Sequence, residues 1–328
     1  MALTLTSQAE FTTLLAKEGK ELLFYLHGMG QFAHKVIETT DSLQTNFDSQ
    51  KPEEVLVVPV EWACAEKEGL GGIPVIGQVL RYGDDQKNAE FAGSALWKLS
   101  TGLKKEMGSE RTLSLNVMAH SMGNRVLRSV GKSSIPDGDA SWNEKGLQGK
   151  TLLQAAPADL QNNENLFENI FFVSADIPET VFNEPNGKHS EQAEHALQSG
   201  VAALAVMTKR MHVLHANGTD EQLNKSFMLN VLNARLGSRG PWSSTIFGGG
   251  EKANGGYGLG RGEPSKVWDK IGDALEYESI EADGSVNNGN VHVKDCSPWN
   301  TVASHNGHSY QFAPEAVAYY LEHMTKVV

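Results

Sequence analysis

The sequence predicts an α/β protein with a mostly parallel, doubly wound sheet and helices on both faces. Six short apolar runs recur along the chain, and longer stretches with helical periodicity lie between them. Runs this short and this apolar are typical of strands buried on both faces, as parallel sheets require. Because parallel strands are joined through crossover helices, the alternation predicts helices on both sides of one sheet.

We expect strands at the six apolar runs and amphipathic helices at residues 86–99 and 192–207. The runs cover residues 22–26, 55–60, 113–118, 170–173, 211–214 and 291–293. Ligands of such sheets bind beyond the carboxyl ends of the strands. The residues that follow each run are therefore the candidates for chemistry.

The domain organisation is expected to be simple. Although 328 residues correspond to about two domains of average size, no linker divides the chain, and we expect a single domain over residues 1–328. Three segments do not fit the sheet. Residues 132–150 predict a surface excursion, residues 177–210 a helical insertion, and residues 237–262, with ten glycines, a loop or flap.

Composition and charge narrow the class of partner. Hydrophobic residues make up 40% of the chain and charged residues 21%, which is ordinary for a globular protein. The formal net charge is −12, from 40 acidic and 28 basic residues. An excess of negative charge disfavours nucleic acids and anionic membrane surfaces as partners.

Cysteine usage and hydropathy indicate the compartment. Cys64 and Cys296 are the only cysteines, so neither a disulfide framework nor a zinc site of cysteines is expected. The first 26 residues lack the order of a signal peptide, and no stretch approaches the ~18 apolar residues of a membrane span. We expect a cytoplasmic protein. The alternative is an oxidising compartment, in which the two cysteines could form one disulfide.

The strongest chemical signal follows the third run, where the sequence reads Ala119-His120-Ser121-Met122-Gly123 and continues with helical periodicity. A nucleophilic serine on a tight strand-to-helix turn needs small residues two positions before and after it. Ala119 and Gly123 meet this need. No other serine of the chain has glycine or alanine two positions before it together with glycine two positions after it. The following helix would direct backbone N–H groups at a developing oxyanion. The plainer alternative is a serine that caps a helix.

These motifs resemble the α/β-hydrolase superfamily. The resemblance rests on the turn at Ser121, on HGMG at residues 27–30, and on a chain order of Ser, then Asp, then His. More narrowly, AHSMGNRVL, Trp62, DEQLNKS at Asp220 and the late HSY at His308 resemble a mainly bacterial serine-hydrolase branch. Two features depart from the superfamily pattern. Ala119 stands where glycine is commoner, and HGMG comes too early to be preceded by two strands, which implies an α/β-hydrolase fold lacking its first two strands.

The resemblance implies an oxyanion hole made of two backbone N–H groups. By position these belong to Met122, directly after the serine, and Met29, in the loop after the first run. The plainer interpretation of residues 27–30 is a glycine turn at the end of a strand.

The base must be one of 11 histidines. His308 is the favoured candidate on the family pattern, because it follows the last run and Gly307 lets the chain turn. His305 is the alternative base, and His292, inside the strand pattern, is a weaker one. His120 is expected to point away from the serine and to line the pocket wall or pack.

The acid must be a carboxylate at a strand end near the histidine. Asp220 follows the fifth run through a turn, and Asp176 follows the fourth run and is the alternative acid. Each would also make an ordinary helix cap.

No cofactor and no metal are expected. The residues His305, His308 and Asp295 lack a recognised metal-binding spacing, and the glycine-rich GGGEKANGGYGLGRG lacks the GK[ST] ending of a phosphate loop. The predicted function is a serine hydrolase of the carboxylesterase type, which acts on a small-molecule acyl substrate. The alternatives are an amidase or thioesterase, or a binding or scaffolding protein on the same fold. The oligomeric state stays open.

Overall fold

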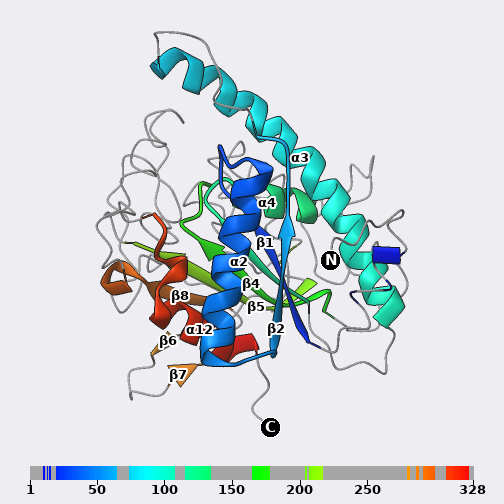
Figure 1. Cartoon of the computed structure of the whole chain (residues 1–328), viewed down its shortest axis with the longest axis vertical. Coiled ribbons are helices and arrows are strands. Elements are labelled where there is room, and N and C mark those ends of the chain that lie inside the picture. The colour runs from blue at the N-terminus through cyan, green and yellow to red at the C-terminus, as the bar shows by residue number, and fades with distance from the viewer. Residues whose placement is uncertain are drawn as a thin grey trace, which may run out of the picture.

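Six strands form one parallel sheet in the order β2-β1-β3-β4-β5-β8 (Figure 1). The strands are β1 (Glu21–Leu26), β2 (Val55–Val60), β3 (Leu115–His120), β4 (Phe167–Val173), β5 (Thr208–His215) and β8 (Val291–Asp295). The computed structural model describes residues 10, 11, 13, 15, 20–64, 74–107, 115–133, 165–177, 204, 207–216, 279–280, 286–287, 291–299 and 308–324. A separate antiparallel pair joins β6 (Ser279–Ile280) to β7 (Val286–Asn287).

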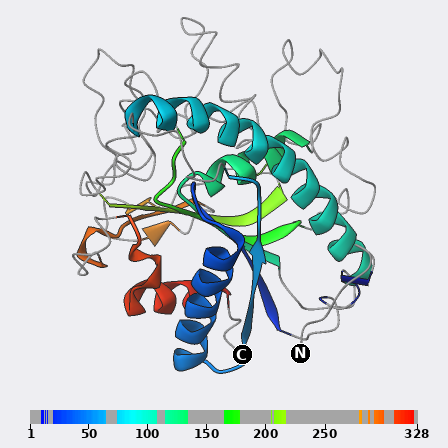
Figure 2. The ribbon, with the colours of Figure 1, turned by 45° about the horizontal axis from the view of Figure 1, so that its top comes forward.

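Helices cover both faces of the sheet. Figure 2 shows α3 (Pro74–Met107) and α4 (Gly123–Ser133) on one face, and α2 (Ala33–Gln50) and α12 (Pro314–Met324) on the other. Two short 3-10 helices, η3 (Ser297–Trp299) and η5 (Tyr310–Phe312), lie in the C-terminal part. No helix in the described parts of the chain is long and apolar enough to cross a membrane.

Alternation along the strands explains this arrangement. In β1, Leu22 and Phe24 join the apolar core beside α3 and α4, whereas Leu23 and Tyr25 join the core beside α2 and α12. All four side chains are completely buried. A strand whose two faces are both apolar is stable only between two helical layers. The predicted α/β class and parallel sheet are thereby confirmed.

The predicted elements are found with shifted ends. Each apolar run lies in or overlaps one strand of the sheet, and the predicted helix at 86–99 lies inside the longer α3. The predicted helix at 192–207 is described only at Leu204 and Met207, both helical. Residues 132–133 end α4 and residues 208–210 begin β5, so the expected excursion and insertion are shorter there. Within these two segments the structure also describes Ile177, Leu204 and Met207. The rest of both segments and the whole of 237–262 lie outside the described residues.

The strand β2 lies at one edge of the described sheet, next to β1 alone. The Gln44 side chain of α2 binds the outer side of β2: its Nε2 donates to Val55 O at 2.9 Å, and its Oε1 accepts from Val57 N–H at 2.9 Å. Pro59 follows two residues later.

Candidate active site

The strand order reverses between β1 and β3, and the ends of these two strands form the candidate site. From β1 the chain moves outward to β2, whereas β3, β4, β5 and β8 extend in the other direction. Gly123 marks how closely the two ends approach. A Cβ atom there would collide with the carbonyl oxygens of Leu26 and His27, at 2.7 Å from the latter. Only glycine fits, which accounts for the small residue that follows Ser121 by two positions.

Ser121 lies between β3 and α4 with a φ of 53°. This left-handed conformation costs a residue other than glycine about 1–2 kcal/mol. Backbone hydrogen bonds hold it: Ser121 N–H donates to Val173 O at 3.0 Å, and Ser121 O accepts from Asn124 N–H and Asp176 N–H, both at 3.1 Å. Strain held by several bonds is typical of functional sites.

The Asn124 side chain supports the turn and was not identified from the sequence. Its Nδ2 donates to Ala119 O at 2.8 Å and Ser121 O at 3.0 Å, and it lies 3.3 Å from Val173 O. Asn124 is completely buried. The available signal was an asparagine in the first turn of the helix after the serine, a type of residue that binds nearby backbone groups.

The loop after β1 lies against the Ser121 side chain. A Cβ atom on Gly28 would be 3.0 Å from Ser121 Cβ and 3.5 Å from Ser121 Oγ. The backbone of this loop therefore passes beside the hydroxyl, as a donor to an oxyanion must. Met29, next in the chain, is 45% exposed, whereas Met122 is buried.

Trp62 and His27 fix the same loop. Trp62 Nε1–H donates to His27 O at 3.0 Å, Trp62 N–H donates to His27 Nε2 at 3.3 Å, and the two rings stack at 5.2 Å. His27 Nδ1–H donates to Gly28 O at 2.8 Å. Burial lowers the pKa of His27, which the bond to Gly28 O opposes only in part. The imidazole therefore stays neutral and can accept the Trp62 N–H.

His308 reaches this edge of the sheet just before η5. Its carbonyl accepts a hydrogen bond from His120 Nε2 at 2.8 Å and another from Ser174 Oγ at 3.1 Å. The His120 and His308 rings lie 4.7 Å apart. His120 thus packs, as expected, and its ring lies against that of the proposed base. His308 itself is partly exposed.

His120 is neutral at ordinary pH. Burial, reinforced by His308, lowers its pKa to about 3. A neutral imidazole that binds a carbonyl oxygen must carry its proton on the bonded nitrogen, so Nε2 is the donor.

Tyr310 connects the His308 segment to the sheet. Its hydroxyl accepts from Ser174 N–H at 2.9 Å and donates to Leu214 O at 2.6 Å. Ser174 has a φ of 43° and is completely buried. The ends of β4 and β5 are thus joined through one side chain, a connection that sequence patterns do not reveal.

Of the two candidate acids, Asp176 lies within the described residues. Asp176 is 3% exposed, and its N–H donates to Ser121 O, which places its backbone beside the turn. Asp220 and the alternative base His305 lie outside the described residues.

Other polar clusters have structural explanations. Asp295 Oδ1 accepts from the Ser297 hydroxyl at 2.6 Å and the Ser297 N–H at 2.9 Å, so it caps η3. His212, with His292 and His323 beside it, has both ring nitrogens bonded, to Tyr319 and Asn169. Within the described residues, no group of three potential ligands could hold a metal ion.

A parallel sheet covered on both faces, with a strained serine at its switch point, defines the class of α/β hydrolases. A family model described as "Alpha/beta hydrolase of unknown function (DUF900)" matches residues 4–246. The match covers well over half of the chain, which therefore belongs to this family. No curated protein and no solved structure matches the chain.

Proposed function

We propose that the protein is a serine hydrolase that cleaves a carboxylic ester or related acyl bond through an acyl-enzyme. One observation carries the proposal: Ser121, strained at a φ of 53°, follows β3 and touches the loop that follows β1. A serine held in this way presents its hydroxyl beside backbone donors. Membership of an α/β-hydrolase family supports the hydrolytic class.

In the proposed mechanism Ser121 Oγ attacks the acyl carbonyl while His308 accepts the hydroxyl proton. His308 then returns the proton to the leaving group. In the second half of the reaction water attacks the acyl-enzyme, His308 accepts a proton from the water and returns it to Ser121 Oγ, and the acid product leaves. Asp220 holds the His308 imidazole in the required tautomer, with Asp176 as the alternative acid. An acid in this role remains ionised and stabilises the imidazolium.

The backbone N–H groups of Met29 and Met122 are the proposed oxyanion donors. Each such donor contributes roughly 3 kcal/mol to stabilisation of the transition state when it is fixed in place. The contacts of Trp62 with His27 support a fixed loop on one side, and those of Asn124 support a fixed turn on the other.

A fluorophosphonate probe tests the proposal, since it labels an activated serine. We expect labelling of the wild type and none of Ser121→Ala, with the same melting temperature for both. Ser129→Ala is the control, because it removes a serine hydroxyl that is buried in α4 and binds Glu90 O, and this variant should label normally. A wild type that takes no probe would overturn the proposal in favour of a binding or scaffolding protein. Ester, thioester and anilide substrates with the same acyl group then separate an esterase from a thioesterase or amidase.

We also propose a small-molecule acyl substrate and a cytoplasmic location. The net charge of −12 supports a partner other than nucleic acid. Cys64 and Cys296 are both free thiols, a usage typical of the reducing cytoplasm.

A further inference from the structure

Two side chains at the ends of different strands meet on one backbone oxygen, the carbonyl of His308. His120 ends β3 and Ser174 follows β4, and both donate to this oxygen. We propose that His120 and Ser174 are positioning residues, which hold the main chain of His308 and thereby set the place of its imidazole. This inference rests on the proposed function, because it takes His308 as the base.

His120 connects the two sides of the candidate site. Its Nδ1 edge lies against the loop after β1, where a Cβ atom on Gly28 would be 3.3 Å away, and its Nε2 binds the His308 carbonyl. The ring is 5% exposed. A rigid, buried ring between the oxyanion loop and the base segment fixes the spacing of the two.

Ser174 supplies the second bond from an uncommon backbone conformation. Its φ of 43° is held because its N–H donates to the Tyr310 hydroxyl, which in turn donates to Leu214 O. A carbonyl oxygen has two lone pairs, so donors from His120 and Ser174 use both. Residues held in uncommon backbone conformations by their surroundings cluster at functional sites.

Positioning of this kind is separate from chemistry. On the proposed mechanism neither residue touches the reacting atoms, since both bind the backbone of His308. A displacement of about 1 Å at a catalytic group can lower the rate up to 100-fold. Losing a donor should therefore lower kcat and leave KM nearly unchanged.

Two amide variants at residue 120 test the role of its donor. Glutamine places an amide nitrogen near the position of Nε2, whereas asparagine places one near Nδ1. We expect His120→Gln to keep kcat within about 3-fold of the wild type, and His120→Asn to lose on the order of 10- to 100-fold at unchanged KM. Equal kcat for the two variants, or losses that follow the melting temperature, would overturn the inference.

A pair of serine variants provides a second test that does not depend on the histidine variants folding. Ser174→Ala and Ser129→Ala each remove one buried hydroxyl that donates to a backbone carbonyl, of His308 and Glu90 respectively. Their melting temperatures should fall alike, but only Ser174→Ala should lower kcat, by about 3- to 10-fold. Equal kcat in both variants would contradict the proposed role of Ser174.

The kcat values of the wild type and of Ser121→Ala are measured in the same assays as the variants at residues 120 and 174. If the activity does not depend on Ser121, the proposed function fails. If it depends on Ser121 and His308 but His120→Asn and Ser174→Ala match their controls, only the positioning inference fails.

Discussion

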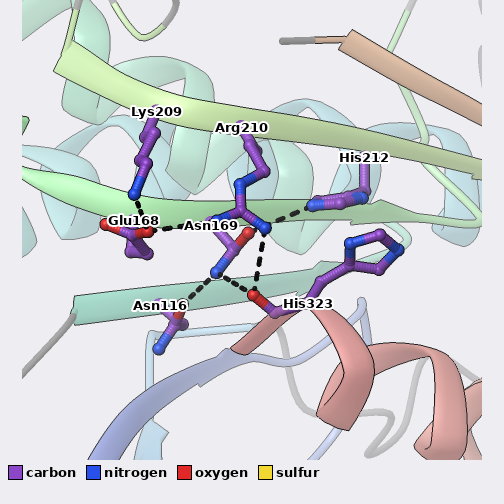
Figure 3. Close-up of polar contacts among 7 residues, drawn as sticks. All are labelled: Asn116, Glu168, Asn169, Lys209, Arg210, His212 and His323. Carbon is purple, nitrogen blue, oxygen red and sulfur yellow. Dashed lines mark hydrogen bonds and ion pairs between the residues drawn. The ribbon is translucent and has the colours of Figure 1, made fainter. Parts of the chain in front are cut away.

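Two buried histidine regions of the sheet use their hydrogen bonds in opposite ways. On the face beneath α12, His212 has both ring nitrogens bonded: Nδ1 accepts from Tyr319 OH at 2.9 Å, and Nε2–H donates to Asn169 Oδ1 at 3.2 Å. Figure 3 shows Asn169 continuing the network to Asn116 and to the His323 carbonyl. At the strand ends, the bonds from His120 and Ser174 go to the backbone of His308, a residue that is partly exposed.

The difference separates structural from chemical use of one residue type. A ring with both nitrogens bonded inside the fold is neutral and fixed, and it stabilises the sheet. A partly exposed residue whose backbone is held has its position defined, and its side chain is the part that can serve a substrate. Four outcomes would sharpen or break this comparison.

The largest expected effect is on the rate, at His308. We expect His308→Gln to lower kcat for a p-nitrophenyl ester by about 10⁴-fold or more, because loss of the base disables the nucleophile. The melting temperature should change little. His305→Gln is the control and should keep its activity, and the reverse ranking would transfer the role of base to His305.

The next effect concerns the acid. Asp220→Asn should lower kcat by about 10³- to 10⁴-fold, because an amide favours the wrong tautomer of the base. Asp176→Asn should cost far less, and steady-state kinetics on the purified variants decide between them. If Asp176→Asn is the more damaging change, the acid follows β4 and not β5.

In the His212 network the expected effect is on stability. His212→Leu would remove the hydrogen-bond partner of Asn169 Oδ1, which is completely buried, at a cost of about 1–3 kcal/mol. Urea unfolding should show a free energy of unfolding lower by this amount, while kcat of the folded protein stays unchanged. Tyr319→Phe removes a single donor and should cost less. A loss of kcat at full stability would show that this region takes part in the chemistry.

The smallest effect is on the pH dependence of stability, to which both regions contribute. Burial lowers the pKa of His120 to about 3 and that of His212 well below its ordinary value. Below about pH 6.5 the unfolded chain binds protons at these residues and the folded protein does not, so stability falls as pH falls. Each contributes up to about 1.4 kcal/mol per pH unit.

Urea unfolding of His120→Gln at pH 6.5, 5.5 and 4.5 measures this contribution. The variant lacks one such group, so its free energy of unfolding should fall less steeply than that of the wild type. An unchanged slope would mean that His120 is not held in its neutral form.

The parallel sheet could be predicted from the sequence because its strands are apolar on both faces, and this pattern is local in the chain. The turn at Ser121 was equally accessible, since the small residue at Gly123 reflects a close approach of two backbones. The role of Tyr310 was not, because it binds the backbone of a segment 96 residues away in the chain. The bond from His120 to the His308 carbonyl was not accessible for the same reason, because the two residues are 188 positions apart in the sequence.

The outer side of β2 has a consequence for how the molecule behaves in a crowded solution. An unpaired strand at a sheet edge can recruit a strand from another chain and begin aggregation. Here the amide of Gln44 occupies Val55 O and Val57 N–H much as a neighbouring strand would, and Pro59 has no N–H to offer. At the edge of the described sheet, Gln44 and Pro59 therefore leave β2 fewer free backbone groups onto which a second molecule could add.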